Sequence, residues 1–444
     1  MSDIVAGFDY GTSHCAIALI RAAGAVASEA AVPAINMVPL EEDRPLIAST
    51  LYAPKADFEL DLGDDAVLDM TAQSFRDLSF GQAALNAYLS NPTEGYFVKS
   101  PKSFLGAPGL SELVKERFIS IVAAMMGNVK IKADQAAGSA VDKVVIGRPV
   151  NFQGAEGQAE NQQALSMLVA AAREAGFEET AFLFEPMAAA FDFERSLNQE
   201  QRLLVVDIGG GTTVCSFVLV GPQRMASRNR DADVLGHSGE RLGGNDYDQM
   251  LALKALMPAF GMGDKLQNGL PIANNYFVDA VSTNDVNAQQ RFYARSTGER
   301  FEEIWRDAVH PERFVRLLRL REGRGTYQLL RSAELAKIGL SDAEIVAADL
   351  GFVDPGLALN CSRADLAESI ERLLEHLSGL IAETRSQGGS APDAIYLTGG
   401  MARSQVVREH LNSVCGDVPL IDSDHFTSVT QGLALWAARV FAGD

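Results

Sequence analysis

One stretch, Leu203 to Val220 (LLVVDIGGGTTVCSFVLV), constrains the fold more than any other part of the sequence. It contains an apolar run, an aspartate, three glycines, a threonine and a second apolar run. Consecutive glycines allow a sharp turn whose backbone N–H groups gather in a concave patch that binds phosphate. An acidic side chain beside such a patch holds a hydrated metal ion. The stretch therefore predicts a strand–turn–strand phosphate hairpin, which differs from the usual phosphate loop that leads from a strand into a helix.

A shorter hairpin of the same kind is predicted at the start of the chain. Ile4 to Ile20 (IVAGFDYGTSHCAIALI) repeats the order apolar run, Asp, any residue, Gly, Thr, apolar run. We expect strands at residues 4–9 and 15–20, with Asp9 at the end of the first. Because Asp and Gly favour turns in general, this pattern alone also fits a plain β-turn. Together with the later hairpin, it predicts a two-lobed nucleotide clamp.

Composition and charge limit the class of protein. The chain has 444 residues, enough for two large lobes, and 47% of them are hydrophobic. A formal net charge of −20 argues against a nucleic-acid or anionic-membrane partner, because phosphate contacts need Lys and Arg. The sequence shows no basic and apolar leader, no long apolar run and no paired-cysteine metal motif. We therefore expect a soluble cytoplasmic protein whose cysteines are buried and reduced.

Several further elements are predicted from local patterns. Lys143–Ile146 and 181–184 are expected strands, and Glu185-Pro186 begins a helix, since Pro is favoured in the first helical turn. Ser362 and Asp365 form a capping pattern that opens a long helix. The other expected elements are helices at 158–175, 331–345, 403–412 and 429–441, a strand at 394–398, and a mostly helical region at 253–328.

These motifs together resemble the ATPase domain of the DnaK-type heat-shock chaperones, within the actin-like ATPase superfamily. The chain is most similar to the YegD-like group, chaperone-like proteins that consist of little more than this domain. The resemblance implies an α/β fold of two lobes, each with a ribonuclease-H-like mixed sheet flanked by helices, and a nucleotide cleft between the lobes. Lobe I is expected at 1–202, with an inserted subdomain at roughly 40–116. Lobe II is expected at 203–444, with a helical subdomain at roughly 244–350, and the helix 429–441 packs back on lobe I.

The resemblance assigns functional residues position by position. The family's catalytic lysine falls on Lys102, with Lys99 as the second candidate, and its E-P-x-A-A glutamate falls on Glu185. Asp9 and Asp207 are the expected magnesium residues, acting mainly through water. The first phosphate motif is Gly11, Thr12 and Ser13, and the second is Gly209, Gly210, Gly211 and Thr212. The nucleoside motifs are Gly243, Gly244, Glu334, Lys337, Ser341, Gly399, Gly400 and Arg403, and the hinge motif is Arg148-Pro149.

Two positions depart from the family pattern. Val214 stands where the family usually has Asp, two residues after the turn threonine, and Phe426 stands at a second acidic position. Because the first of these acids orders the water around the metal, its loss is expected to weaken catalysis more than binding.

The resemblance implies that the protein binds ATP or ADP with magnesium and hydrolyses ATP slowly as a conformational switch. Three alternatives stay open: a nucleotide-binding protein with little turnover, a sugar-kinase-type phosphotransferase, and an actin-like filament protein. A protein partner is expected at the helical region 253–328. No peptide-binding domain is expected in this chain.

Overall fold

The computed structural model describes residues 4–22, 34–54, 78–90, 94–152, 157–225, 227, 230–421 and 427–442. The described chain is a mixed α/β protein with two large mixed sheets flanked by helices. It divides into two compact units. Unit 1 comprises Met1–Arg241, Gly379–Ala402 and Asp417–Asp444, and unit 2 comprises Leu242–Ser378 and Arg403–Gly416. Both large sheets lie in unit 1, so the lobe boundary at 202/203 stays a prediction.

The first large sheet of unit 1 has six strands and contains the first predicted hairpin. Its strands, in spatial order, are β3 (Asn36–Met37), β2 (His14–Arg21), β1 (Ile4–Tyr10), β8 (Lys143–Arg148) and β9 (Glu179–Phe184), with β4 (Ile47–Ala48) also paired to β2. β1 runs antiparallel to β2 and parallel to β8, and β8 runs parallel to β9. Burial of nearly every residue in β1 and β2 matches their apolar sequences.

The second large sheet has five strands and repeats the same local arrangement. In spatial order they are β12 (Val234–Glu240), β11 (Thr213–Val220), β10 (Gln201–Ile208), β15 (Ala394–Thr398) and β16 (Leu420–Ile421). The β10–β11 hairpin is antiparallel, and β10 runs parallel to β15. Both predicted hairpins are therefore confirmed as structural elements, each with a parallel strand beside its incoming strand.

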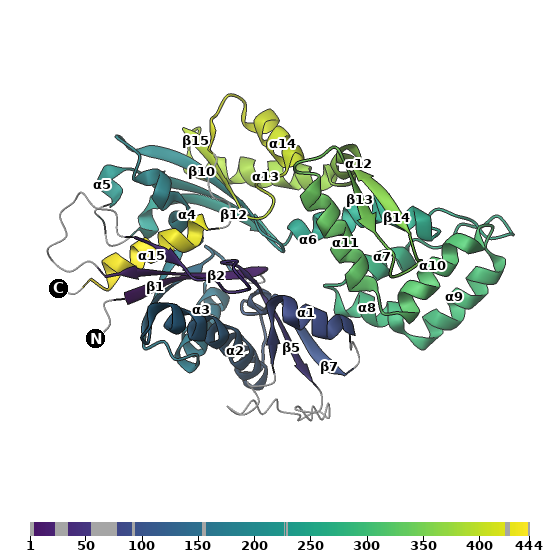
Figure 1. Cartoon of the computed structure of the whole chain (residues 1–444). Coiled ribbons are helices and arrows are strands. Elements are labelled where there is room, and N and C mark those ends of the chain that lie inside the picture. The colour runs from purple at the N-terminus through teal and green to yellow at the C-terminus, as the bar shows by residue number, and fades with distance from the viewer. Residues whose placement is uncertain are drawn as a thin grey trace. The chain divides into compact units, whose positions relative to one another are not determined.

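Two helices join the sheets into one core. α4 (Glu185–Glu194) and α15 (Ser428–Val440) share a buried cluster with residues of β1, β2, β10 and β11. In Figure 1, α15 is the yellow helix beside β1 and β2, and it packs against both strands and against α4. Glycines permit this close approach, because a Cβ on Gly432 would lie 1.9 Å from the Ala188 carbonyl oxygen and one on Gly7 would lie 2.0 Å from the Ala434 nitrogen.

The remaining elements of unit 1 cover the first sheet or extend from it. α2 (Glu112–Ala137) and α3 (Gln158–Glu174) pack on each other and share a core with β1 and β8. A small sheet of β6 (Ser79–Phe80), β5 (Thr50–Pro54) and β7 (Gly95–Lys99) carries α1 (Gly81–Ser90). Shorter helices are α5 (Pro222–Met225) and the 3-10 turns Pro101–Phe104 and Asp231–Asp233, and α13 (Glu371–Gly388) crosses from unit 2 into unit 1.

Unit 2 is mostly helical. Its helices are α6 (Gly244–Leu251), the π-helical turn Ala252–Leu256, the 3-10 turn Met257–Phe260, α7 (Asn275–Val281), α8 (Val286–Tyr293), α9 (Arg295–Asp307), α10 (Pro311–Glu322), α11 (Thr326–Gly339), α12 (Arg363–Ser369) and α14 (Gln405–Cys415). β13 (Ile345–Asp349) and β14 (Ala358–Ser362) form a hairpin that packs on α11. Edge-to-face contacts among Phe277, Phe292, Phe301 and Phe314 hold the helices together.

Two helix predictions are wrong in their bounds. The helix expected at 331–345 begins earlier and ends at Gly339, because Val346 pairs with Cys361 in the β13–β14 hairpin. The long helix expected after Ser362 is two helices, since Ile370 has φ −103° and ψ 8° and separates α12 from α13. The capping pattern itself is confirmed, because the Ser362 side chain accepts a hydrogen bond from the Asp365 N–H group.

Candidate nucleotide site

The two motif aspartates occupy equivalent places in the two sheets. Asp9 lies one residue before the end of β1, and Asp207 lies one residue before the end of β10. The pKa of each carboxyl group is raised from 3.8 to about 7, mainly by burial and next by the neighbouring Glu185, while Lys102 opposes the change. Burying a carboxylate disfavours its charged form, so a cation placed beside these groups would restore their ionisation. The aspartates are therefore a suitable environment for a positive ion.

The first glycine turn is braced from outside its own hairpin. A Cβ at Gly11 would lie 2.3 Å from the His14 carbonyl oxygen, so this tight turn requires glycine. The Ser49 hydroxyl donates to the Gly11 carbonyl at 2.7 Å, and the Ser49 N–H group donates to the Ser13 carbonyl at 2.8 Å. Sequence reasoning missed Ser49, because its partners precede it by more than 30 residues and no local motif marks it.

Ser13 carries a direct indication of a missing ligand. Its Oγ atom is buried and has no hydrogen-bond partner in the described structure. A buried hydroxyl without a partner costs free energy, on the order of 1–3 kcal/mol, unless something else satisfies it. The Ser13 hydroxyl is therefore free to donate to an anion at this turn, which is the role that the sequence motif predicts.

The second glycine turn lies against the first and against a third glycine segment. The Gly209 N–H group donates to the Thr212 carbonyl at 2.9 Å and closes the turn. A Cβ on Gly211 would lie 3.5 Å from the Thr12 methyl carbon, so the two turns meet. Gly399 has φ +85°, and a Cβ there would lie 2.4 Å from the Ile208 carbonyl oxygen and 2.6 Å from the Asp207 carboxylate. Only glycine fits at position 399.

Lys102 and Glu185 form a partly buried ion pair in the site. Lys102 Nζ lies 2.6 Å from Glu185 Oε1, and the lysine is only 6% exposed. The 3-10 turn Pro101–Phe104 positions the lysine, and Glu185 is the first residue of α4 directly after β9. Burial alone would lower the pKa of Lys102, but Glu185 and Asp9 outweigh this effect and raise it, so the ammonium stays charged.

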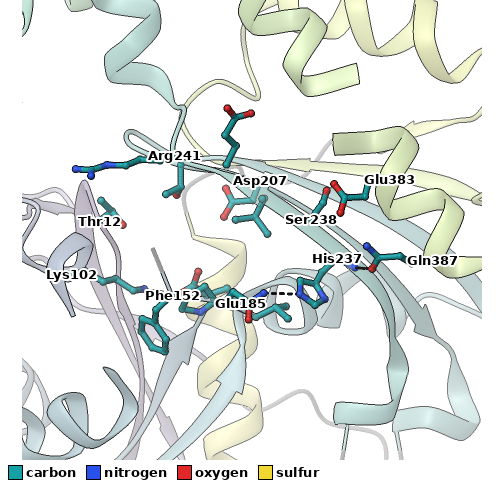
Figure 2. Close-up of a pocket in the computed structure, with 17 residues that line it drawn as sticks. Thr12, Lys102, Phe152, Glu185, Asp207, His237, Ser238, Arg241, Glu383 and Gln387 are labelled. Carbon is teal, nitrogen blue, oxygen red and sulfur yellow. Dashed lines mark hydrogen bonds and ion pairs between the residues drawn. The ribbon is translucent and has the colours of Figure 1, made fainter. Parts of the chain in front are cut away.

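A cavity of about 450 Å³ within unit 1 is lined by Lys102, Glu185 and Asp207, whereas Asp9 and Ser13 are not among its lining residues. Figure 2 shows Thr12 and Lys102 approaching it from the side opposite His237 and Gln387, with Asp207 and Glu185 between them. Val214 also lines it. Lys99, the second lysine candidate, is not among the lining residues, whereas Lys102 is. The lining residues are Thr12, Lys102, Pro149, Val150, Asn151, Phe152, Glu185, Asp207, Thr212, Val214, His237, Ser238, Gly239, Glu240, Arg241, Glu383 and Gln387.

One side of the cavity was not predicted from the sequence. His237 Nε2 lies 2.8 Å from the side-chain amide nitrogen of Asn151. The backbone N–H group of His237 donates to Gln387 Oε1 at 2.9 Å. Asn151 follows the predicted hinge motif, in which Arg148 stacks at 3.9 Å on Phe184. These polar residues come from distant parts of the chain, and no spacing in the sequence connects them.

Several residues of unit 2 that are predicted to bind the nucleoside form hydrogen bonds or ion pairs with other residues of unit 2. Lys337 Nζ donates to the Gly244 carbonyl at 2.9 Å and lies 2.8 Å from the Asp248 carboxylate. Asp246 accepts from the Gly243 N–H group at 2.7 Å, at the start of α6. Glu334 lies 2.6 Å from Arg331 on the same helix. Lys337 thus anchors the beginning of α6.

Two predicted nucleoside residues lie outside the expected helices. Ser341 follows the end of α11 at Gly339, so it does not share a helix face with Glu334 and Lys337 as the sequence predicted. Arg403 is exposed and precedes α14, while Gly400 follows Gly399 after β15. Phe426 lies outside the described residues. Assembly of these residues around a nucleotide stays a prediction.

One comparison with known proteins bears on this geometry. The family model described as Hsp70 protein matches residues 114–267. Over these residues, which are less than half of the chain, the protein is similar to the Hsp70 family. The matched Hsp70 region contains Glu185, the second glycine turn and the Gly243–Gly244 segment, but not the first glycine turn, Lys102 or the residues of α11. Because Hsp70 proteins are ATP-binding chaperone-like ATPases, the match implies a nucleotide as partner.

Three further observations concern metal ligands, cysteines and helix length in the described residues. In the described residues no group of three or more His, Cys, Asp or Glu side chains is placed to hold a metal ion. Cys15, Cys215, Cys361 and Cys415 are buried free thiols. Burial raises the pKa of Cys15 to about 12, so this thiol stays neutral beside Ser49. Within the described part of the chain, none of the helices has the length and apolar character needed to cross a membrane.

Proposed function

We propose that this protein binds ATP with magnesium and hydrolyses it slowly, using the hydrolysis as a conformational switch of the chaperone type. The observation that carries the proposal is the partly buried Lys102–Glu185 pair, which acts electrostatically on Asp9 and Asp207 and shares a cavity with Thr12 and Thr212 of the two glycine turns. The Hsp70 match over residues 114–267 supports it independently of this geometry. The YegD-like subgroup belongs to the same proposal.

Each group has a role that follows from its position. The N–H groups of the two glycine turns, with the Ser13 hydroxyl, bind the phosphates. The Lys102 ammonium neutralises negative charge that develops on the transferred phosphoryl group, and Glu185 orients the attacking water or accepts its proton. Catalysis of this reaction depends mainly on positioning and electrostatics, which rigid buried groups supply without reorganisation.

Asp9 and Asp207 are the residues we assign to the magnesium ion. Two partly buried carboxyl groups with raised pKa values fit a cation, and magnesium is usually held by one or two carboxylates while it keeps several of its waters. When bound, magnesium neutralises phosphate charge. Val214 lines the same cavity with an apolar side chain, so one of the family's water-ordering acids is missing.

A nucleotide-binding protein with little turnover is the second candidate function. It is favoured by Val214, because an apolar side chain cannot order the water near the phosphate. In both candidates ATP binds; they differ only in the rate of the chemical step. A sugar-kinase-type activity needs an acid directed at a substrate hydroxyl, and no second substrate motif supports it.

Calorimetric titration combined with phosphate release separates these functions. We expect ATP and ADP to bind in the presence of magnesium, with weaker binding after the metal is removed with EDTA. A single-turnover measurement then gives the rate of phosphate release. Slow release supports the ATPase, and binding without release supports the second candidate. Absence of binding to both nucleotides contradicts the whole proposal, and release that requires an added sugar would favour the phosphotransferase.

A further inference from the structure

The far end of α4 carries a buried carboxylate that nothing in the nucleotide site explains. Glu194, the last residue of α4, is completely buried. Its Oε1 accepts from the Gly221 N–H group at 2.9 Å and from Arg230 Nη2 at 2.8 Å, and its Oε2 accepts from Arg230 Nη1 at 2.9 Å. Arg230 is 2% exposed and also contacts Asp233. We call Glu194, Gly221 and Arg230 the Glu194 tie.

The tie is a costly way to obtain stability alone. Removing two charges from water is expensive, and a buried ion pair often contributes no more than apolar residues of similar volume. What the bidentate pair adds is direction, because a planar guanidinium and a carboxylate accept only one relative orientation. The tie therefore fixes how the end of α4 is placed against the end of β11 and the connection that follows.

Both elements that meet at the tie begin in the nucleotide site. α4 starts with Glu185, which contacts Lys102, and extends about 15 Å to Glu194 at the usual rise per residue. β11 follows the second glycine turn directly and ends at Val220, next to Gly221. α4 packs against β10 and β11 along the way. The helix and the hairpin are thus connected at the end remote from the cavity.

We propose that Glu194 is a positioning residue that sets the placement of Glu185 relative to the second glycine turn. The inference rests on the proposed nucleotide function. When ATP draws the glycine turns toward Lys102 and Glu185, the tied helix and hairpin move as one body instead of sliding past each other. Because small misplacements of reacting groups reduce rates strongly, a loose tie lowers turnover without removing any group that contacts the nucleotide.

A natural reporter lies next to the tie. The Arg230 guanidinium lies 5.4 Å from the Phe191 ring centre, and Phe191 stacks on Trp436 with ring centres 5.7 Å apart. The chain has two tryptophans, and the other one, Trp305, lies in unit 2. A Trp305→Phe variant therefore makes the fluorescence of Trp436 a specific signal of rearrangement at the tie.

The test uses the full chain with Trp305→Phe as the parent. We expect magnesium and ATP to change the Trp436 emission of the parent. Adding Glu194→Gln keeps the size of the side chain but removes its charge. In that variant we expect the ATP dissociation constant to stay within about threefold, the emission change to fall at least about fivefold, and single-turnover phosphate release to slow about tenfold, in the range expected for misplaced groups. If Glu194 only stabilised the fold, Glu194→Gln would lower the melting temperature but would not reduce the emission change and the rate at an unchanged ATP dissociation constant.

The chain offers a matched control in unit 2. Asp279 is 6% exposed and also binds an arginine through both oxygens, at 2.6 and 3.1 Å from Arg291. Asp279→Asn in the same parent should leave the emission change and the rate unaltered. Glu194→Asp, which keeps the charge but shortens the side chain, serves as the second test variant if Glu194→Gln does not fold.

The outcomes distinguish failure of the proposed nucleotide function from failure of the positioning role of Glu194. Absence of ATP binding by the parent overturns the proposed function and the tie together. ATP binding with an unchanged emission response and rate in the Glu194 variants overturns the tie alone. Failure of both Glu194 variants to fold would assign this residue to stability and also reject the positioning role.

Discussion

The residues predicted to bind the phosphates and those predicted to bind the nucleoside differ in the contacts that they make in the absence of a ligand. In unit 1, Lys102, Glu185, Asp9 and Asp207 act electrostatically on one another, although they come from four separate elements. In unit 2, the polar groups of Lys337 and Glu334 already bind neighbours of their own unit. The first set is thus an assembled and partly unsatisfied centre, whereas Lys337 and Glu334 of the second set have protein partners in the absence of ligand.

This difference indicates which property each set controls. Groups that repel their neighbours or lack partners, such as the partly buried Asp9 and the buried Ser13 hydroxyl, gain from a bound cation and a bound anion, respectively. Groups that already hold α6 in place gain less from the nucleotide and contribute more to the folded state. Substitutions on the phosphate side should therefore act on the rate, and those around Lys337 should act on stability.

The largest effect is expected for Lys102→Ala. Removing one electrostatic group that stabilises the transition state costs about 3 kcal/mol of barrier, or roughly a hundredfold in single-turnover phosphate release. Lys143→Ala is the control, since that lysine is 40% exposed in its pair with Glu179 and lies outside the cavity lining. An unchanged rate in Lys102→Ala would remove this lysine from the mechanism and weaken the contrast between the two sets.

Lys337→Met tests the other side of the comparison. It leaves Asp248 buried without its cation, which should lower the free energy of unfolding by about 3 kcal/mol, measured by urea denaturation. Phosphate release at saturating ATP should stay within a few-fold of the parent rate. Lys254→Met, at the exposed pair with Glu368 in the same unit, should cost less than about 1 kcal/mol. A rate loss as large as that of Lys102→Ala would abolish the distinction.

Gly399→Ala tests the contact between the third glycine segment and Asp207. The new Cβ would collide with the Ile208 carbonyl and the Asp207 carboxylate, so we expect about tenfold weaker ATP binding by calorimetry, or about 1.4 kcal/mol. Gly389→Ala is a close control, because Gly389 also has a positive φ, +68°, but open space around it. Equal losses in both variants would trace the effect to backbone strain alone.

Val214→Asp should have the smallest effect and the opposite sign. It restores an acid to the cavity lining, and we expect phosphate release to rise several-fold, by less than about 1.4 kcal/mol of barrier. ATP affinity should change little. Val214→Asn, which has the same shape without the charge, should leave the rate near the parent value. If Val214→Asp releases phosphate no faster than Val214→Asn and the parent, Val214 does not limit turnover.

The sequence predicted the local elements of the site well. Both glycine hairpins, the strand before Glu185 and the Ser362 capping box form as expected, because each depends on residues within a few positions of one another. The sequence placed the end of this helix at residue 345, but α11 ends at Gly339, because strand pairing of Val346 with Cys361 overrides the helical pattern. Local propensity decides such elements only where tertiary pairing does not compete.

The sequence by itself determined the glycine turns and their aspartates, since backbone conformation and residue chemistry are properties of short segments. Lys102 and Glu185 became candidates only through the resemblance to the DnaK-type ATPase domain. Only the tertiary structure decided that Ser49 braces the first turn, that Gly399 packs on Asp207, and that Glu194 binds Gly221 and Arg230. These contacts join residues up to nearly 200 positions apart, and their partners are chosen by packing and burial, for which no local pattern exists.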